Sequence, residues 1–193
     1  MTDIQTDDGP LATSKHPSTA AEEAASRVPD AKGDALVGRA VTINKPASEL
    51  YSYFRDFSNL ATFMENVVRI DVHDDTRSHW VVKAPAGQTV EWDAIVTEDQ
   101  PDRLIAWTAA EGADIPNSGR VEFRDAGARG TVVEATILYD PPAGVIGKVI
   151  AKMFQREPNM QARQDLKRFK QLMETGEVST RARNCREYEE EQN

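Results

Sequence analysis

Residues 131–154 read TVVEATILYDPPAGVIGKVIAKMF, and the spacing of their apolar side chains changes at the two prolines. Before the prolines, apolar residues alternate with other residues, which is typical of a strand with one buried face. Those residues are Val133, Ala135, Ile137 and Tyr139. After the prolines, apolar residues recur every three to four positions, which is typical of an amphipathic helix. Those residues are Val145, Val149, Ile150, Met153 and Phe154.

The helical spacing continues beyond this stretch and predicts a long C-terminal helix. Its later apolar members are Ala162, Leu166, Phe169, Leu172 and Met173. Because a proline steers the residue before it out of the α region, we expect a kink or break near Glu157-Pro158. Gly176 can end the helix, since glycine readily adopts the left-handed conformation of a helix C-terminus.

Upstream of residue 131, turn signals divide the chain at regular intervals. Apolar and polar residues alternate between these turns, which predicts an antiparallel meander of about six strands. The turns are residues 73–76, 84–87, 99–102, 112–119 and 126–130. Before the meander, alternation at Val41 and Ile43 predicts a strand that ends at Asn44. Helical spacing after Pro46, and again after a cap at Ser58, predicts two short helices.

The ends of the chain differ in composition from its centre. Of the net charge of −9, the first 35 residues carry −4 and residues 177–193 carry −2. The first 35 residues contain no aromatic side chain, so they bury too little apolar surface to offset the entropy of ordering. We therefore expect a disordered tail over residues 1–35, a folded domain over 36–177, and a disordered charged tail over 178–193.

Composition also excludes several classes of protein. The longest apolar run, Leu104–Trp107, is far shorter than the roughly 20 residues of a membrane-spanning helix, although peripheral membrane contact stays open. A single cysteine, Cys185, cannot form an internal disulfide, and no apolar signal segment follows Met1. These features favour a reducing, cytoplasmic location. The nearly neutral centre argues against nucleic-acid binding, which needs clustered basic residues. Oligomeric state is left open.

Eight short stretches together resemble a known group of proteins. They are INKP (43–46), DFSNL (56–60), FME (63–65), WVVKAPAG (80–87), EWDA (91–94), IAW (105–107), RGT (129–131) and YDPPAG (139–144). Through them, residues 36–177 resemble the START-like (SRPBCC) helix-grip superfamily, which includes the coenzyme Q-binding proteins. Within it they are most similar to the bacterial polyketide cyclase/dehydrase-type subgroup. The resemblance implies an α+β fold in which a curved antiparallel sheet wraps around a long C-terminal helix, with two short helices after the first strand.

The strand pattern also predicts which sheet face is buried. If Lys83, Glu91 and Glu122 face water, the opposite face points inward, because side chains alternate along a strand. The inward residues are then Val68, Ile70, Val72, Trp80, Val82, Val90, Trp92, Ala94, Val96, Ile105, Trp107, Val121, Phe123, Val133, Ala135, Ile137 and Tyr139. This set contains no carboxylate, histidine or lysine, so it suits an apolar ligand better than acid–base chemistry.

We therefore predict that a lipid, quinone or polyketide-like molecule binds in a cavity between the sheet and the C-terminal helix. The predicted lining is Trp80, Trp92, Trp107, Phe123, Ile137, Tyr139, Val149 and Met153. No catalytic residue, metal or cofactor is expected. Three alternatives stay open: a core filled by its own side chains, a polyketide cyclase/dehydratase-type enzyme that uses the same cavity, and a protein-interaction module.

Other polar residues suit structural roles at least as well as functional ones. Tyr139 can bond a ligand or the backbone, and Asp140 is placed as a helix cap. Asp56 lies at the end of the first helix, where we expect it to be exposed to solvent. An acidic turn with nearby histidines invites a metal site, but Asp-rich hairpin turns are common. The turn residues concerned are His73, Asp74, Asp75 and His79. The stretch GARG (127–130) lacks the Lys-Ser/Thr of a phosphate loop and precedes a strand.

Overall fold

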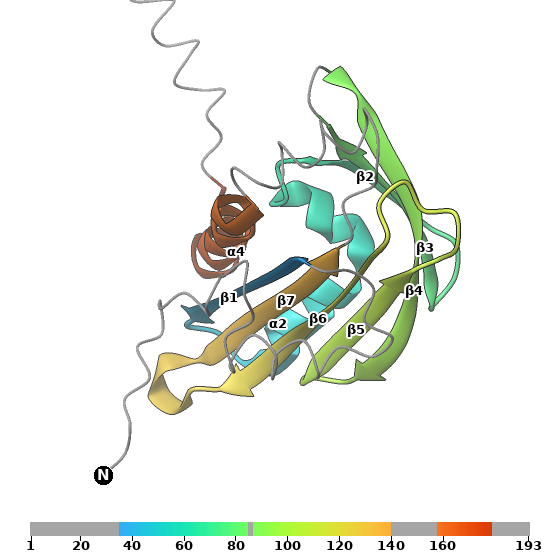
Figure 1. Ribbon diagram of the computed structural model, residues 1–193. Coiled ribbons are helices and arrows are strands. Elements are labelled where there is room, and N and C mark those ends of the chain that lie inside the picture. The colour runs from blue at the N-terminus through green and yellow to red at the C-terminus, as the bar shows by residue number, and fades with distance from the viewer. Residues whose placement is uncertain (1–34, 85–86, 140–157, 179–193) are drawn as a thin grey trace, which may run out of the picture.

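In a computed structural model that describes residues 35–84, 87–139 and 158–178, the chain forms one curled, seven-stranded antiparallel sheet (Figure 1). The strands are β1 (Ala35–Ile43), β2 (Val67–Val72), β3 (Arg77–Lys83), β4 (Thr89–Gln100), β5 (Leu104–Ala109), β6 (Asn117–Asp125) and β7 (Thr131–Tyr139). Their order is β1-β7-β6-β5-β4-β3-β2, so β2 to β7 form the predicted meander. The first strand joins the sheet beside the last.

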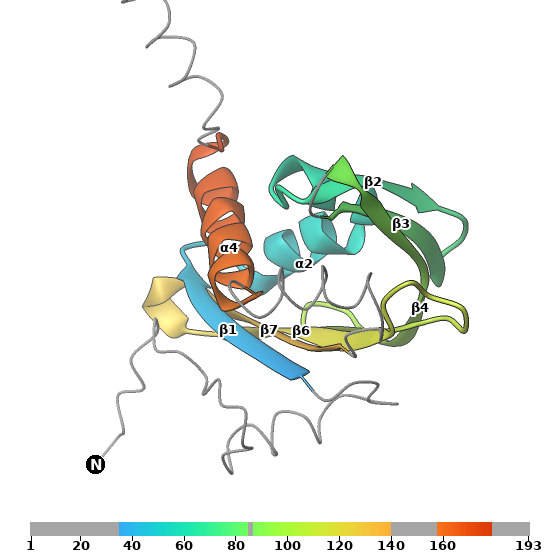
Figure 2. The same cartoon turned by 45° about the horizontal axis from the view of Figure 1, so that its top comes forward.

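The helices lie on the concave side of this sheet (Figure 2). They are α2 (Ala47–Arg55), the 3₁₀ helix η1 (Phe57–Thr62) and α4 (Pro158–Thr175), with a short 3₁₀ turn η3 (Gly127–Arg129) between β6 and β7. α4 runs alongside β1, where Lys170 Nζ donates to the carbonyl of Thr42 at 2.6 Å. The predicted fold class and element order are confirmed. Residues 140–157, which hold the expected first part of the long helix, lie outside the described residues, as do most of both predicted tails.

Register confirms most of the predicted inward face. The cross-strand pairs on the concave face include Trp80–Trp92, Val82–Val90, Val96–Trp107, Ile105–Val121 and Phe123–Val133. The prediction was wrong for Val68 and Val72, which are 47% and 51% exposed. The register of β2 shifts between Val67 and Arg69, so Val68 is the extra residue of a bulge. Val72 ends an edge strand and lies opposite Ser78.

Aromatic side chains from four elements build the main core. Phe54 of α2, Phe63 after η1, Phe123 of β6 and Phe169 of α4 are all at most 4% exposed. Ring centroids of Phe63 and Phe169 are 4.8 Å apart, and those of Phe54 and Phe169 are 5.8 Å apart. Phe169, together with buried Leu166, therefore packs α4 onto the aromatic core.

Candidate functional site

Two tryptophans on neighbouring strands form a stacked pair on the concave face. Trp80 of β3 lies opposite Trp92 of β4, with ring centroids 5.9 Å apart and an interplanar angle of 12°. Phe57 extends the aromatic group, with its ring centroid 6.3 Å from that of Trp80. Both indoles are only partly buried. The pair thus presents a flat apolar surface that the described side chains do not fully cover.

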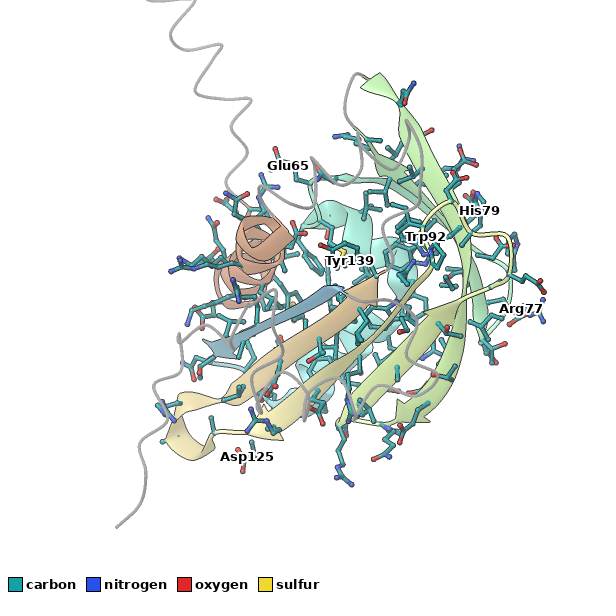
Figure 3. The ribbon with its side chains drawn as sticks, viewed as in Figure 1. Glu65, Arg77, His79, Trp92, Asp125 and Tyr139 are labelled. Atoms are coloured by element: carbon teal, nitrogen blue, oxygen red, sulfur yellow. The ribbon has the colours of Figure 1, made fainter. Side chains whose placement is uncertain are left out.

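Tyr139 lies with Trp92 in a second, smaller apolar cluster, separate from the main core. Val90, Ile115 and Tyr139 are buried there, and Trp92 and Ala162 pack against them. Both Trp92 and Tyr139 point into the curl of the sheet (Figure 3). Burial raises the pKa of the Tyr139 phenol, so the group stays neutral and keeps its proton at physiological pH. The structure therefore brings Trp92 and Tyr139, which are 47 positions apart in the chain, into one cluster with Ala162 of α4.

Trp107 lies against β6 because position 119 has no side chain. Trp107 is opposite Gly119, and a Cβ atom built on Gly119 would lie 2.5 Å from the indole Cζ2. The Trp107 indole N–H donates to Asn117 Oδ1 at 3.3 Å, and Asn117 Nδ2 donates to the carbonyl of Ile115 at 3.0 Å. Sequence reasoning placed residues 112–119 in a loop and so missed Asn117 and Gly119, which lie in β6.

Replacing Gly119 by alanine should therefore destabilise the protein by about 1–3 kcal/mol, the usual cost of overpacking. The new methyl group would also meet the backbone oxygen of Thr136 at 2.8 Å, so the indole and the strand must both shift. Urea unfolding of the full chain measures the loss. A Trp107→Phe background gives the matched control, because the smaller ring leaves space and the same substitution should then cost less. An equal cost in both backgrounds would show that the contact with the Thr136 oxygen, and not the contact with the indole, causes the loss.

The remaining predicted lining residues lie in different surroundings. Phe123 belongs to the main core, where its ring is 5.9 Å from Tyr51 and 6.1 Å from Phe54 between centroids. Ile137 is partly buried and lies opposite Gly119 on β7. Val149 and Met153 lie outside the described residues.

Hydrogen bonding distinguishes the three indoles. The Trp80 N–H donates to Ser78 Oγ at 2.9 Å, and the Trp107 N–H is engaged by Asn117. No described residue accepts a hydrogen bond from the Trp92 N–H. Among the described indoles, Trp92 is thus the one whose donor is available to an oxygen atom of a bound molecule.

A carboxyl group that the inward sheet residues did not include lies on α4. Asp165 Oδ1 accepts a hydrogen bond from the backbone N–H of Glu65 at 3.4 Å, and Glu65 pairs with Arg168 at 3.1 Å. Burial, with the nearby Glu65 charge, outweighs the opposing effects of the Glu65 N–H and Arg168, and raises the Asp165 pKa to about 7. Figure 3 shows Glu65 at the α4 side of the sheet. Asp165 follows Ala162 by three positions, so helical spacing places the two side chains on neighbouring parts of one helix face. This spacing is the sequence feature from which Asp165 could have been predicted to face the sheet.

A guanidinium also lies on the concave face of β1. Arg39 is two residues before buried Val41, so both side chains lie on the same face of β1, and Arg39 lies opposite Ala135 of β7. Burial, together with the charge of Arg163, lowers the pKa of Arg39, and its NH1 donates to the carbonyl of Gly38 at 2.8 Å. The concave face is therefore apolar and aromatic in its middle, and the Arg39 guanidinium adds one charged group at the β1 edge.

The acidic turn has a structural role. Asp74 accepts hydrogen bonds from the backbone N–H groups of Thr76 and Arg77 at 2.7 and 2.9 Å, which lower its pKa. His79 points away from the concave face and contacts Asp93 at 2.7 Å, which raises the His79 pKa. Within the described ranges, no cluster of three or more His, Cys, Asp or Glu side chains could hold a metal ion. The predicted cap at Ser58 was wrong: Ser58 lies inside η1, and Asp56 caps that helix by accepting from the Ser58 N–H at 3.2 Å. Asp140 lies outside the described ranges.

Comparisons with known proteins agree with this architecture. A family model described as "Polyketide cyclase / dehydrase and lipid transport" matches residues 43–167. An uncharacterized 17.2 kDa protein from the melC2-rnhH intergenic region of Streptomyces lincolnensis is 32% identical over 139 residues, which are 72% of this chain and 89% of that protein.

Two solved structures share the fold. DR_A0006 from Deinococcus radiodurans has a TM-score of 0.61 and 44% identity, over 74% of this chain and 98% of that one. Zhui aromatase/cyclase from Streptomyces sp. R1128 has a TM-score of 0.59 and 15% identity, over 75% and 98%. At that identity the likeness shows the fold alone.

No helix among the described residues is long and apolar enough to cross a membrane.

Proposed function

Because the chain belongs to the polyketide cyclase/dehydrase and lipid transport family, with its START-like helix-grip fold, we propose that it binds an apolar small molecule without chemically changing it. The proposed site lies between the concave face of the sheet and α4. The observation that carries the proposal is the stacked Trp80–Trp92 pair beside the buried phenol of Tyr139.

The chemistry of these side chains favours one class of ligand. Indole faces contribute large apolar area with defined geometry, and a flat ring can stack on them. The Trp92 N–H supplies a hydrogen-bond donor at this surface, and the phenol of Tyr139 lies in the same cluster. A molecule with an apolar or ring-shaped body and one or two oxygen atoms, such as a lipid, a quinone or a polyketide, fits this combination.

A second candidate function rests on Asp165. A carboxyl group whose pKa lies near 7 is suited to general acid–base catalysis, because both protonation states are populated at neutral pH. A cyclase/dehydratase-type enzyme would use such a group to move protons. Asp165, however, accepts its hydrogen bond from the Glu65 N–H, in the segment after η1. The aromatic residues of the sheet supply no acid or base. Binding without turnover is therefore the better supported proposal.

Titration of the full chain with a quinone, a fatty acid and an alkane, followed by tryptophan emission, tests the proposal. We expect the quinone and the fatty acid to change the emission, because they displace water beside partly buried indoles. Mass spectrometry of the ligand after release separates the two candidate functions: an unchanged mass supports binding, and loss of water supports a dehydratase. Unchanged emission with all three probes would contradict binding at this site.

The Trp92→Phe variant should bind the quinone more weakly by about 0.5–1.5 kcal/mol, the net contribution of one hydrogen bond. Its affinity for the alkane should change little, because phenylalanine keeps most of the apolar area. Trp107→Phe is the matched control, since its N–H already bonds Asn117. Equal losses of quinone affinity in the two variants would contradict the proposed hydrogen bond from the Trp92 N–H to the ligand.

A further inference from the structure

The two edges of the sheet are covered differently. α4 packs along β1, which forms one edge. β2 forms the other edge, and within the described residues no strand pairs with its outer side. An edge strand presents unpaired backbone donors and acceptors to any strand that can approach.

Hydrogen bonds show which backbone groups of β2 face outward. The N–H of His73 donates to the carbonyl of Arg77 at 3.0 Å and closes the β2–β3 hairpin. Because such pairs alternate along an antiparallel ladder, the backbone groups of Ile70 and Val72 point to the open edge. The Val67 N–H is already used by the Met64 carbonyl at 3.2 Å, so the open part of the edge begins after it.

The side chains of this open segment are symmetric about Ile70. Arg69 and Asp71 flank it with opposite charges and are largely exposed; within one chain Arg69 Nε donates to Asp71 Oδ2 at 2.8 Å, so in a paired edge each charge would lie between two opposite charges. Val68 and Val72 flank these in turn, and they are the two exposed large hydrophobic residues of the described chain. A sequence of this kind is complementary to itself when it runs antiparallel to a second copy.

We propose that β2 pairs with β2 of a second copy about a two-fold axis at Ile70, which joins two sheets into one. In this register Arg69 lies opposite Asp71 of the second copy, and Val68 lies opposite Val72 of the second copy. Such an interface is isologous, as expected of most homodimers. Charged residues on an edge strand usually discourage pairing, but here each charge meets its opposite.

The length of the ladder predicts the strength of the dimer. The proposed ladder spans only residues 68–72 of each copy, and Val68 at its end is the extra residue of the bulge, so the buried area falls in the range of weak, transient complexes. The proposal does not depend on the ligand proposed above, because β2 contributes its outer edge and not the aromatic group.

Sedimentation velocity of the full chain, from about 10 μM to about 1 mM, tests this interface. We expect the wild-type protein to shift from monomer to dimer across this range. Arg69→Asp and Asp71→Arg should each raise the dissociation constant about tenfold or more, since both create two like-charge pairs. An equal mixture of the two variants should form a heterodimer, because each Asp then meets an Arg.

Arg103→Asp, in the exposed turn between β4 and β5, makes the same change in net charge as Arg69→Asp and serves as the control for that variant. It should dimerise like the wild type. Recovery of the dimer on mixing cannot come from a folding defect, so it would support the pairing directly. A wild type that stays monomeric throughout, or a mixture with no more dimer than either variant alone, would overturn the proposal. A dimer that persists unchanged in both variants would place the interface elsewhere and overturn it as well.

Discussion

Replacing Phe169 by alanine should lower the free energy of unfolding by about 3–5 kcal/mol, the range observed for large aromatic residues in protein cores. Phe169 is fully buried, and its ring lies 4.8 Å from that of Phe63 and 5.8 Å from that of Phe54 between centroids. The variant would leave a cavity where α2, the segment after η1 and α4 meet. Since a typical domain is stable by 5–15 kcal/mol, this one change removes a large share.

Urea unfolding of the full chain, followed by circular dichroism, measures this loss. Lys167→Ala is the matched control, because it makes an alanine on an exposed position of the same helix. That variant should change stability by less than about 0.5 kcal/mol. A loss below about 1 kcal/mol for Phe169→Ala would mean that α4 does not pack on the aromatic core.

Replacing Asp165 by asparagine should stabilise the protein by a few kcal/mol above about pH 7, and by little near pH 4. The folded-state pKa of Asp165 is about 7, well above the ordinary value of 3.8, mainly because the carboxyl is buried. The folded protein therefore holds this proton more tightly than the unfolded chain. Wild-type stability should fall as the pH rises from about 4 to about 7 and then stay level with respect to this group.

One pKa unit corresponds to about 1.4 kcal/mol, so a shift of this size predicts a difference that unfolding experiments resolve easily. The measurement is the free energy of unfolding of both proteins at several pH values. Asp102→Asn is the matched control, because Asp102 is exposed and its φ of 63° suits asparagine equally well. A difference between wild type and Asp165→Asn that does not vary with pH would contradict the raised pKa.

Alternation of apolar residues was sufficient to predict the meander and most of its inward-facing residues. A one-residue slip would move every side chain to the opposite face, so a buried face constrains register strongly. The same rule failed at Val68, because a bulge adds a residue that alternation cannot reveal. The rule failed at Val72 for a different reason. Alternation predicts on which face of the sheet a side chain lies, but it does not predict whether another element covers that side chain.

The candidate site was less accessible to sequence reasoning than the fold. Trp80 and Trp92 could be placed on one face by parity, but their stacking depends on register between two strands. Gly119 looked like part of a loop, although it lies in β6 and makes room for Trp107. Asp165 was missed because the search for acid–base groups followed the strands, while this carboxyl comes from the helix that packs on them.

Native mass spectrometry of the full chain, purified from its own host without organic solvent, tests most directly whether the protein carries an apolar small molecule. We expect an adduct that survives gentle ionisation, is removed by solvent extraction, and is lost in part from the Trp92→Phe variant. Refolded, extracted protein should regain the adduct when the extract is returned. Protein whose mass matches the bare chain under all gentle conditions, and which takes up nothing from the extract, would contradict ligand binding on the concave face.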